Sequence, residues 1–170
     1  CILDQSKLDM ADFHYTTLVK KYGNKIRQCM TDTDSFVHEI QTADLYADIA
    51  ELSDKFDLSN YPKDDPSFSR TNEKQLYKMK DELGGKIMTE FCGIRSKMYS
   101  YQKHGGAEDH RAKGIGRSAS KRLTHQMYLD ALNLKPMEKV SFNTIRAKKH
   151  VIYTATITKT GLSAFDDKRY

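Results

Sequence analysis

Two aspartates, Asp32 and Asp34, stand two positions apart in the segment Thr31-Asp32-Thr33-Asp34-Ser35. In an extended strand, residues two apart leave the same face, so both carboxylates would point one way and Thr33 the other. Carboxylates placed in this manner can bind a pair of divalent cations, and nucleotidyl transfer uses two such ions about 3.5–4 Å apart. Mg²⁺ suits the site because it takes one or two carboxylates and completes its octahedron with water and phosphate oxygens. The pair is therefore one candidate for part of a two-metal site.

Three other roles are open to an Asp-x-Asp segment. Asp, Ser and Thr are ordinary turn residues, so a solvated acidic turn is the commoner role of such a pair. A calcium loop of the EF-hand type fits badly, because Phe36 and Val37 stand where a polar ligand and a glycine are needed, and Ala43 replaces the final glutamate. A metal-dependent phosphatase could take further ligands from Asp166-Asp167, but it would require alternating parallel strands and helices, which the sequence does not indicate.

A second segment with chemical potential is the basic and aromatic run from Ile94 to Tyr101. Strand alternation would place Arg95, Lys97, Tyr99 and Tyr101 on one face. Such a face can follow a nucleic-acid strand, because Lys and Arg meet phosphates while Tyr packs on sugar or base. An amphipathic strand whose long side chains only cover the sheet is the structural alternative.

The elements that must position these residues indicate an α+β chain. Apolar residues that recur every three or four positions predict a helix over 6–22, with Ser6 in its cap and Gly23 as its stop. The apolar stripe of this helix is Leu8, Ala11, Tyr15, Leu18 and Tyr22. Loose alternation predicts a hairpin over 26–40, with the acidic segment at or near its turn. The later predicted elements are a short helix capped by Thr42, a surface loop over 57–72, strands over 74–81 and 86–102, a mobile connection over 103–116, helices over 118–134 with a break at Thr124, and strands between 141 and 158.

Composition limits the class of protein. The 170 residues carry a net charge of +5 and a pI near 9.0, which fit a polyanionic partner without proving one. Three cysteines, Cys1, Cys29 and Cys92, lack the paired spacing of zinc or redox sites, which predicts reduced, mostly buried thiols. Apolar runs are too short to span a membrane and no signal peptide is visible, so an intracellular protein is expected, its compartment left open. The start at Cys1 suggests a piece of a longer protein.

Taken in order, the two motifs resemble the catalytic palm of family B DNA polymerases. Thr31-Asp32-Thr33-Asp34-Ser35 resembles the D-T-D-S motif of that family, and Lys97-Met98-Tyr99 resembles its later K-x-Y motif. The similarity is closest to the protein-primed branch of viruses and large self-synthesising transposons. It extends over nearly the whole chain through further segments, namely Ser6-Lys7, Phe13-His14-Tyr15, Lys80-Asp81-Glu82, Ile145-Arg146, His150, Ile152-Tyr153-Thr154, Leu162-Ser163-Ala164 and Asp166-Asp167-Lys168-Arg169.

The resemblance implies an activity and assigns residues to it. Asp34 would be the principal Mg²⁺ ligand, with Asp32 its less direct partner, and Lys97 and Tyr99 would contact the primer strand near its growing end. Arg95, from the basic face described above, is added to them as a DNA-binding candidate. The implied reaction adds dNTPs to a primer 3′ hydroxyl on a DNA template, in a parent enzyme whose primer could be a terminal protein. The carboxylate motif that completes the metal site, the motif that binds the incoming nucleotide and the exonuclease domain all precede the region present. Residues 1–170 alone are therefore expected not to extend a primer.

The expected architecture is an antiparallel palm sheet that carries the D-T-D hairpin on helices, followed by a small thumb of helices and a β-hairpin. The palm part is assigned to residues 1–103 and the thumb-like part to residues 104–170. Lys148, Lys149 and His150 form a basic cluster with Arg146, which either contacts duplex DNA or is simply solvated. The rival class is a non-catalytic nucleic-acid-binding domain derived from such a polymerase.

Overall fold

The computed structural model describes residues 1–135 and 139–165, which form an α+β protein. The described residues form three sheets, of two, three and two strands, and each is antiparallel. The chain divides into two compact units, Cys1–Ile87 and Met88–Tyr170, and each has its own hydrophobic core. The expected α+β class is confirmed. No helix among the described residues is long and apolar enough to cross a membrane.

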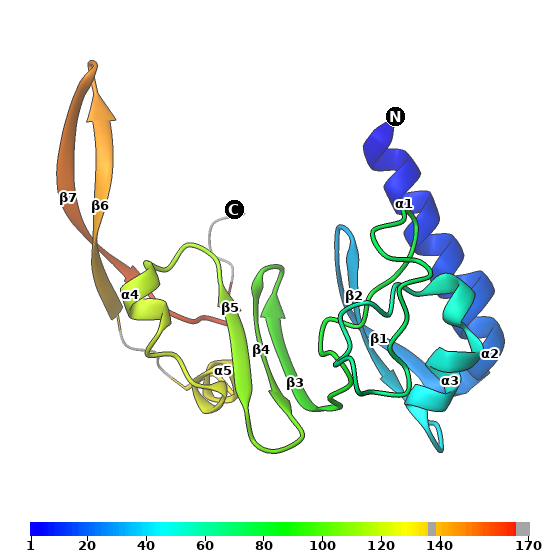
Figure 1. Cartoon of the computed structure of the whole chain (residues 1–170). Helices are drawn as coiled ribbons and strands as arrows, with labels where there is room; N and C mark the ends of the chain where they lie inside the picture. The colour runs from blue at the N-terminus through cyan, green and yellow to red at the C-terminus, as the bar shows by residue number, and fades with distance from the viewer. Residues whose placement is uncertain (136–138, 166–170) are drawn as a thin grey trace. The chain divides into compact units, whose positions relative to one another are not determined.

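A long helix opens the first unit, in blue in Figure 1. It runs from α1 (Ile2–Asp12) through the π-helical η1 (Phe13–Val19) into α2 (Lys20–Tyr22). The predicted helix is confirmed, although it begins before Ser6, so the predicted cap at that residue is wrong. The predicted stripe is also wrong in its first half, because Leu8 and Tyr15 are 62% and 66% exposed. A π-helical turn bonds i to i+5 and shifts the phase of the helix, so positions aligned before it do not continue the same face after it.

The first sheet is a hairpin of β1 (Ile26–Asp32) and β2 (Ser35–Ile40), reached through the 3₁₀ turn η2 (Gly23–Lys25). This hairpin confirms the prediction for residues 26–40. The next helix is α3 (Leu45–Glu51), and its cap is Asp44, whose carboxylate accepts hydrogen bonds from the backbone of Tyr46 and Ala47. The predicted cap Thr42 lies two residues earlier and donates its hydroxyl to Asp48 at 2.6 Å.

The rest of the first unit, from η3 (Ser53–Lys55) to Ile87, is mostly turns. Leu58 and Tyr61 are buried with Ile49, so the predicted surface loop supplies part of the core. The strand predicted over 74–81 is wrong, because this stretch forms turns and pairs only through an isolated bridge between Phe56 and Met79. Leu76 and Tyr77 of this segment are 80% and 69% exposed, so the segment lacks the buried apolar face that a strand packed on a core would need.

The second unit is built on the sheet β3 (Met88–Arg95), β4 (Met98–Lys103) and β5 (Glu108–Ala112). The single long strand predicted over 86–102 is therefore wrong, since the chain reverses at Ser96-Lys97. The mobile connection predicted over 103–116 is wrong as well, because it contains β5. The division expected between residues 103 and 104 falls in the turn between β4 and β5, inside this unit.

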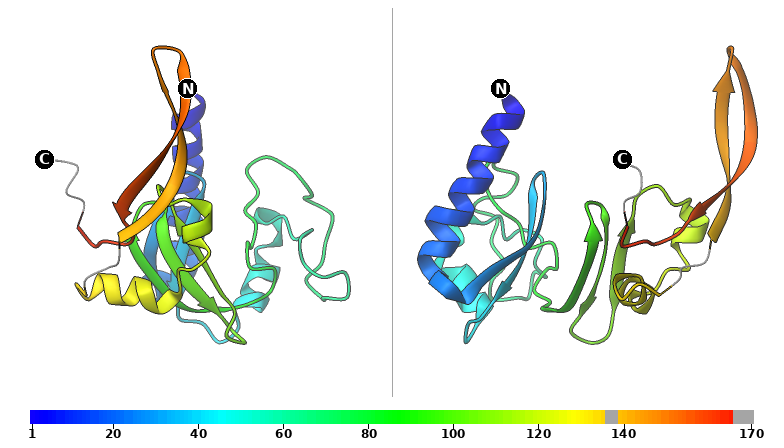
Figure 2. Two further views of the ribbon diagram at one scale, coloured as in Figure 1. Left: turned by 90° about the vertical axis from the view of Figure 1, so that its left-hand side faces the viewer. Right: turned by 180° about the vertical axis from the view of Figure 1, so that it is seen from behind.

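Two helices follow the sheet, α4 (Arg117–Ser120) and α5 (His125–Leu132). The hydroxyl of Thr124 accepts a hydrogen bond from the backbone of Met127, which confirms the predicted break. The side chains of α5 pack against one face of the sheet, where the core residues are Cys92, Met98, Leu123, Tyr128, Ala131 and Leu162. The orientation of α5 alongside the sheet can be followed in Figures 1 and 2.

The chain then forms a long hairpin of β6 (Lys139–Lys148) and β7 (Val151–Thr160), which confirms the strands predicted near the end. Figure 2 shows this hairpin extending past α4. Phe142 on β6 packs against Gly116, the residue that begins α4. The three cysteines are free thiols, but only Cys92 is buried, so the expectation of mostly buried thiols is wrong for Cys1 and Cys29.

Candidate functional site

The two aspartates occupy the tip of the β1–β2 hairpin. Asp32 ends β1 and faces Ser35 across the ladder, so Thr33 and Asp34 form a two-residue turn. The backbone N–H of Asp34 donates to the carbonyl oxygen of Asp32 at 2.7 Å, and the Ser35 hydroxyl donates to the same oxygen at 3.2 Å. Thr33 takes a φ of +60° because a two-residue connection demands a left-handed residue. Asp34 is thus in a turn, and the extended-strand geometry expected for the pair does not apply.

The tip nevertheless keeps both carboxylates within one turn of chain. Asp34 is exposed and Asp32 is partly buried, and the Thr33 hydroxyl donates to Oδ1 of Asp32 at 3.3 Å. Hard carboxylate oxygens match the ligand preference of Mg²⁺, which retains several water ligands and needs few from protein. Among residues 1–135 and 139–165, no three side chains of His, Cys, Asp or Glu gather as metal ligands. Asp32 and Asp34 thus have the ligand type that Mg²⁺ prefers, but two carboxylates are fewer ligands than a complete metal site needs.

The long helix supports the hairpin from β2. Alternation turns Phe36 and His38 toward the helix, where the ring of His14 lies 5.7 Å from Phe36 and stacks on His38 at 5.1 Å. Nδ1 of His14 lies 3.0 Å from Nε2 of His38. Burial, together with the positive charge that His14 can carry, lowers the pKa of His38 to about 4. His38 therefore packs between the hairpin and the helix as a neutral imidazole.

The predicted basic face is divided by the turn between β3 and β4. Lys97 lies in that turn with a φ of +58°. Arg95 faces Met98 across the ladder and its Nε lies 3.4 Å from the buried Met98 sulfur, whereas Tyr99 faces Gly93. Directly opposed residues share a face, so Arg95 belongs with Met98 and not with Tyr99. A β-bulge between Gly93 and Arg95 causes the change, because the extra residue re-aims the side chain.

The structure assembles a different aromatic face on the same sheet. Its rings are Phe91, Tyr99 and Tyr101, each partly exposed, on the face opposite the core residues Cys92 and Met98. Lys103, Asp109 and Arg111 share this face, because Tyr99 opposes Arg111 and Tyr101 opposes Asp109. Phe91 precedes the segment Ile94 to Tyr101 in which the face was expected. Lys103 and Arg111 were not predicted on this face because residues 103–116 were expected to form a mobile connection. The alternation of Asp109 and Arg111 around His110 was the signal that could have revealed them.

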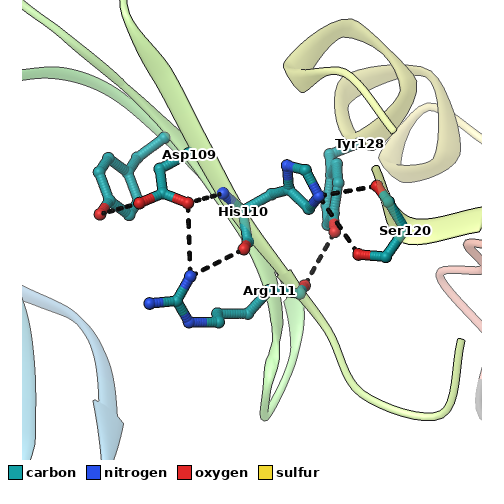
Figure 3. A network of polar contacts seen from close by, with 6 residues as sticks. Asp109, His110, Arg111, Ser120 and Tyr128 are labelled. Atoms are coloured by element: carbon teal, nitrogen blue, oxygen red, sulfur yellow. Dashed lines mark hydrogen bonds and ion pairs between the residues drawn. The ribbon is translucent and has the colours of Figure 1, made fainter. Parts of the chain in front are cut away.

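Figure 3 shows how β5 is tied to the helices of this unit. His110 Nε2 lies 2.9 Å from the carbonyl oxygen of Ser120, and the Tyr128 hydroxyl donates to the carbonyl oxygen of Arg111 at 2.8 Å. On the opposite side of the strand, the Arg111 guanidinium lies 3.3 Å from Oδ1 of Asp109, and the Tyr101 hydroxyl donates to Oδ2 at 3.3 Å. These bonds fix the side chains on both faces of β5.

A serine, a histidine and a carboxylate meet beneath the sheet. The Ser100 hydroxyl lies 2.8 Å from Nδ1 of His125, and Nε2 of His125 lies 3.5 Å from a carboxylate oxygen of Glu90. The trio has the residue types of a nucleophilic triad. Ser100 is 0% exposed, however, so no substrate reaches its oxygen. Ser100 and His125 are a polar part of the core, whereas the Glu90 side chain is 49% exposed.

The two groups of predicted site residues belong to different compact units. Asp32 and Asp34 lie together in the first unit, and Arg95, Lys97 and Tyr99 lie within one hairpin of the second. Asp166 and Asp167, the further ligands of the phosphatase hypothesis, lie outside the described residues. The antiparallel sheets also differ from the parallel arrangement which that hypothesis requires.

Comparison of the chain with protein-family models, with curated proteins and with solved structures finds no match.

Proposed function

We propose that this chain is the C-terminal palm and thumb part of a family B DNA polymerase of the protein-primed branch. The observation that carries the proposal is the two-residue turn that ends one strand at Asp32 and exposes Asp34 at the tip. A tight turn between paired strands holds two carboxylates close together at the tip of the hairpin. There they can bind cations that a triphosphate also binds. When bound, two Mg²⁺ ions would activate the primer hydroxyl and hold the leaving diphosphate.

The roles proposed for the chain's own residues follow their placement. Asp34, exposed, is the principal ligand, and Asp32, partly buried and held by Thr33, is the second. Lys97, in a turn and exposed, is placed to meet a phosphate of primer-template DNA, and Tyr99 lies one strand position beyond Met98 on the open aromatic face. Arg95 lies on the other face of the sheet from Tyr99. Its proposed contribution to DNA binding is that of an exposed positive charge close to Lys97. The substrate in the parent enzyme is a dNTP.

The β6–β7 hairpin supplies a second basic surface. Its 22 residues contain Lys139, Arg146, Lys148, Lys149 and Lys159 and no acidic residue. Its tip is fully exposed, and Lys149 and His150 form the turn with positive φ. Of the two roles considered for this basic cluster, a cationic hairpin of this length favours contact with a phosphate backbone over simple solvation. This supports the proposal that the region is a thumb.

A non-catalytic nucleic-acid-binding domain is the second candidate, favoured by the aromatic and basic face of β3, β4 and β5. The two candidates differ at the acidic tip, since only the polymerase hypothesis needs a metal there. Mn²⁺, a paramagnetic substitute for Mg²⁺, should broaden the amide NMR signals of residues 32–35. Asp34→Asn should abolish the broadening, and Glu73→Gln, on a surface turn of the same unit, should preserve it. Equal broadening in Asp34→Asn would exclude the proposed metal site.

DNA binding is tested by the salt dependence of affinity for a primer-template duplex. Each phosphate contact contributes about 0.9 to the slope of log K against log salt. Lys97→Ala should therefore weaken binding and reduce the slope by about one. Lys63→Ala removes an exposed lysine from a loop of the first unit and should leave the slope unchanged. A wild-type slope in Lys97→Ala would remove the proposed contact.

A further inference from the structure

Phe91, Tyr99 and Tyr101 form a row of rings across β3 and β4. The ring centroids of Phe91 and Tyr99 are 5.9 Å apart, and those of Tyr99 and Tyr101 are 6.5 Å apart with an interplanar angle of 19°. The core of this unit is formed on the other face of the sheet, where α5 packs. The three rings are therefore not needed to fill that core, and each remains partly exposed.

Gly93 allows the aromatic rings to lie close to the backbone of the sheet. It opposes Tyr99 on the neighbouring strand and carries no side chain, so the Phe91 ring can lie over its backbone. A Cβ atom at Gly93 would come within 3.0 Å of that ring. Any other residue at position 93 would project a side chain beside Tyr99. Glycine leaves the surface of the neighbouring rings uncovered.

Cations border the row. The Lys103 ammonium lies 5.6 Å from the centroid of the Tyr101 ring, and Arg111 opposes Tyr99 on β5. Asp109 also lies on this face, where it accepts hydrogen bonds from Arg111 and from the Tyr101 hydroxyl. The Asp109 carboxylate orients both of these side chains. If a base stacked on Tyr101, its phosphate would lie next to the Lys103 ammonium.

We propose that this face binds unpaired nucleotides, whose bases stack on Tyr99 and Tyr101 while Lys103 meets the adjoining phosphate. Partly exposed rings in a row with flanking cations suit a single strand, because every base has a face that can stack on an aromatic ring. Paired bases are stacked on one another and do not offer those faces. The inference adds binding of single-stranded nucleic acid to the proposed function. It does not depend on the metal site or on Lys97.

The test measures binding of fluorescently labelled oligo(dT), oligo(rU) and a duplex of equal length by anisotropy. Tyr101→Leu should weaken binding of the single strands roughly tenfold and leave duplex binding unchanged. Tyr101→Phe keeps the ring but loses the hydrogen bond to Asp109, so it should bind like the unmodified protein. Tyr77→Leu is the matched control, because Tyr77 is 69% exposed in the first unit. The two homopolymers show whether the site prefers DNA or RNA.

Two results would overturn the inference. One is unchanged single-strand affinity in a folded Tyr101→Leu protein, and the other is an equal loss for duplex and single strand. If Tyr101→Leu does not fold, photo-crosslinking of the unmodified protein to oligo(dT) decides, since the crosslinked peptide must contain Tyr99 or Tyr101. A crosslink elsewhere would reject the site. If the Mn²⁺ and Lys97 tests fail while these results hold, the proposed function is wrong and the single-strand site stands.

Discussion

His14 and His38 stack with an interplanar angle of 5° and join the long helix to the acidic hairpin. Their facing nitrogens, Nδ1 of His14 and Nε2 of His38, are 3.0 Å apart, so one ring must donate a proton and the other must accept it. Either ring can accept through an unprotonated nitrogen, so protonation of both rings would break the contact. The position of the hairpin that carries Asp32 and Asp34 is therefore linked to the protonation of a residue remote from its tip.

The first unit should lose stability as pH falls from about 6.5 to about 4. The pKa of His38 is lowered to about 4 by burial and by His14, while the unfolded chain takes up this proton near 6.5. The stabilising contribution of neutral His38 is thus fully present above pH 6.5 and is lost as pH falls toward 4. Because His38 is only partly buried, solvent screening makes the loss smaller than the roughly 3 kcal/mol that the full pKa shift would correspond to. Urea unfolding of His38→Gln should lack this dependence, and an unchanged pH profile in that variant would contradict the assignment.

Asp57 should be the residue whose removal most loosens the turn-rich segment of the first unit. It is 4% exposed, and it accepts hydrogen bonds from the backbone of Ser59 and Lys74 while Lys80 lies 3.0 Å away. Asp57→Ala would remove the acceptor of two part-buried N–H groups and leave Lys80 without this ion pair, at a cost of about 1–3 kcal/mol. Chemical denaturation measures the loss, with the exposed Asp64→Ala as the control. Equal stability of the two variants would show that the segment is held in another way.

The pKa of Asp57 gives a separate prediction in acid. The hydrogen bonds from Ser59, those from Lys74 and the charge of Lys80 lower it far below the usual value. A carboxyl group with a depressed pKa stabilises the fold above its unfolded pKa, near 3.9, and this contribution is lost as pH falls through its folded pKa. Asp57→Asn should therefore flatten the stability profile below about pH 4. The measurement is thermal unfolding across that range, and a wild-type slope in the variant would refute it.

Local patterns predicted the elements whose signals lie within a few residues. The β6–β7 hairpin has a long run of β-branched residues, and Thr124 has the side chain that caps the next helix. The reversal at Lys97 was missed because lysine with positive φ gives no turn signal of the kind that glycine or asparagine gives. The π-helical turn was missed because its cause lies in packing and not in residue type.

The same contrast holds for the candidate site. The alternation over 26–40 predicted the hairpin and put the acidic segment at or near its turn, whereas the spacing of Asp32 and Asp34 wrongly suggested an extended strand at the pair. The face around Tyr99 was predicted only in part, since the alternation was counted through a bulge and a turn. Pairing between Tyr101 and Asp109 depends on strand register, and one residue of register decides which face every side chain occupies.

Ser100 should act in stability and not in hydrolysis. Its hydroxyl is the partner of His125 Nδ1 in the core, and both residues are nearly inaccessible, at 0% and 2% exposure. Ser100→Ala leaves a buried imidazole nitrogen unpaired and should cost about 1–3 kcal/mol. The protein should not react with a fluorophosphonate probe, because a serine without solvent access cannot attack it. Labelling that disappears in Ser100→Ala would show instead that the trio is accessible and nucleophilic.

Gly116 should be required for the attachment of the β6–β7 hairpin to the rest of its unit. A Cβ atom there would lie 2.7 Å from the Phe142 ring and 2.9 Å from its Cβ, so the ring cannot simply rotate away. Gly116→Ala should cost about 1–3 kcal/mol through overpacking. Hydrogen exchange should then rise in β6 and β7 more than in β3 and β4, whereas Ser118→Ala, at an exposed position of α4, should change neither.

The second change Phe142→Ala removes the ring that meets the new methyl group, so the double variant should lose less stability than the sum of the two single changes. Strict additivity would show that Gly116 and Phe142 do not pack together.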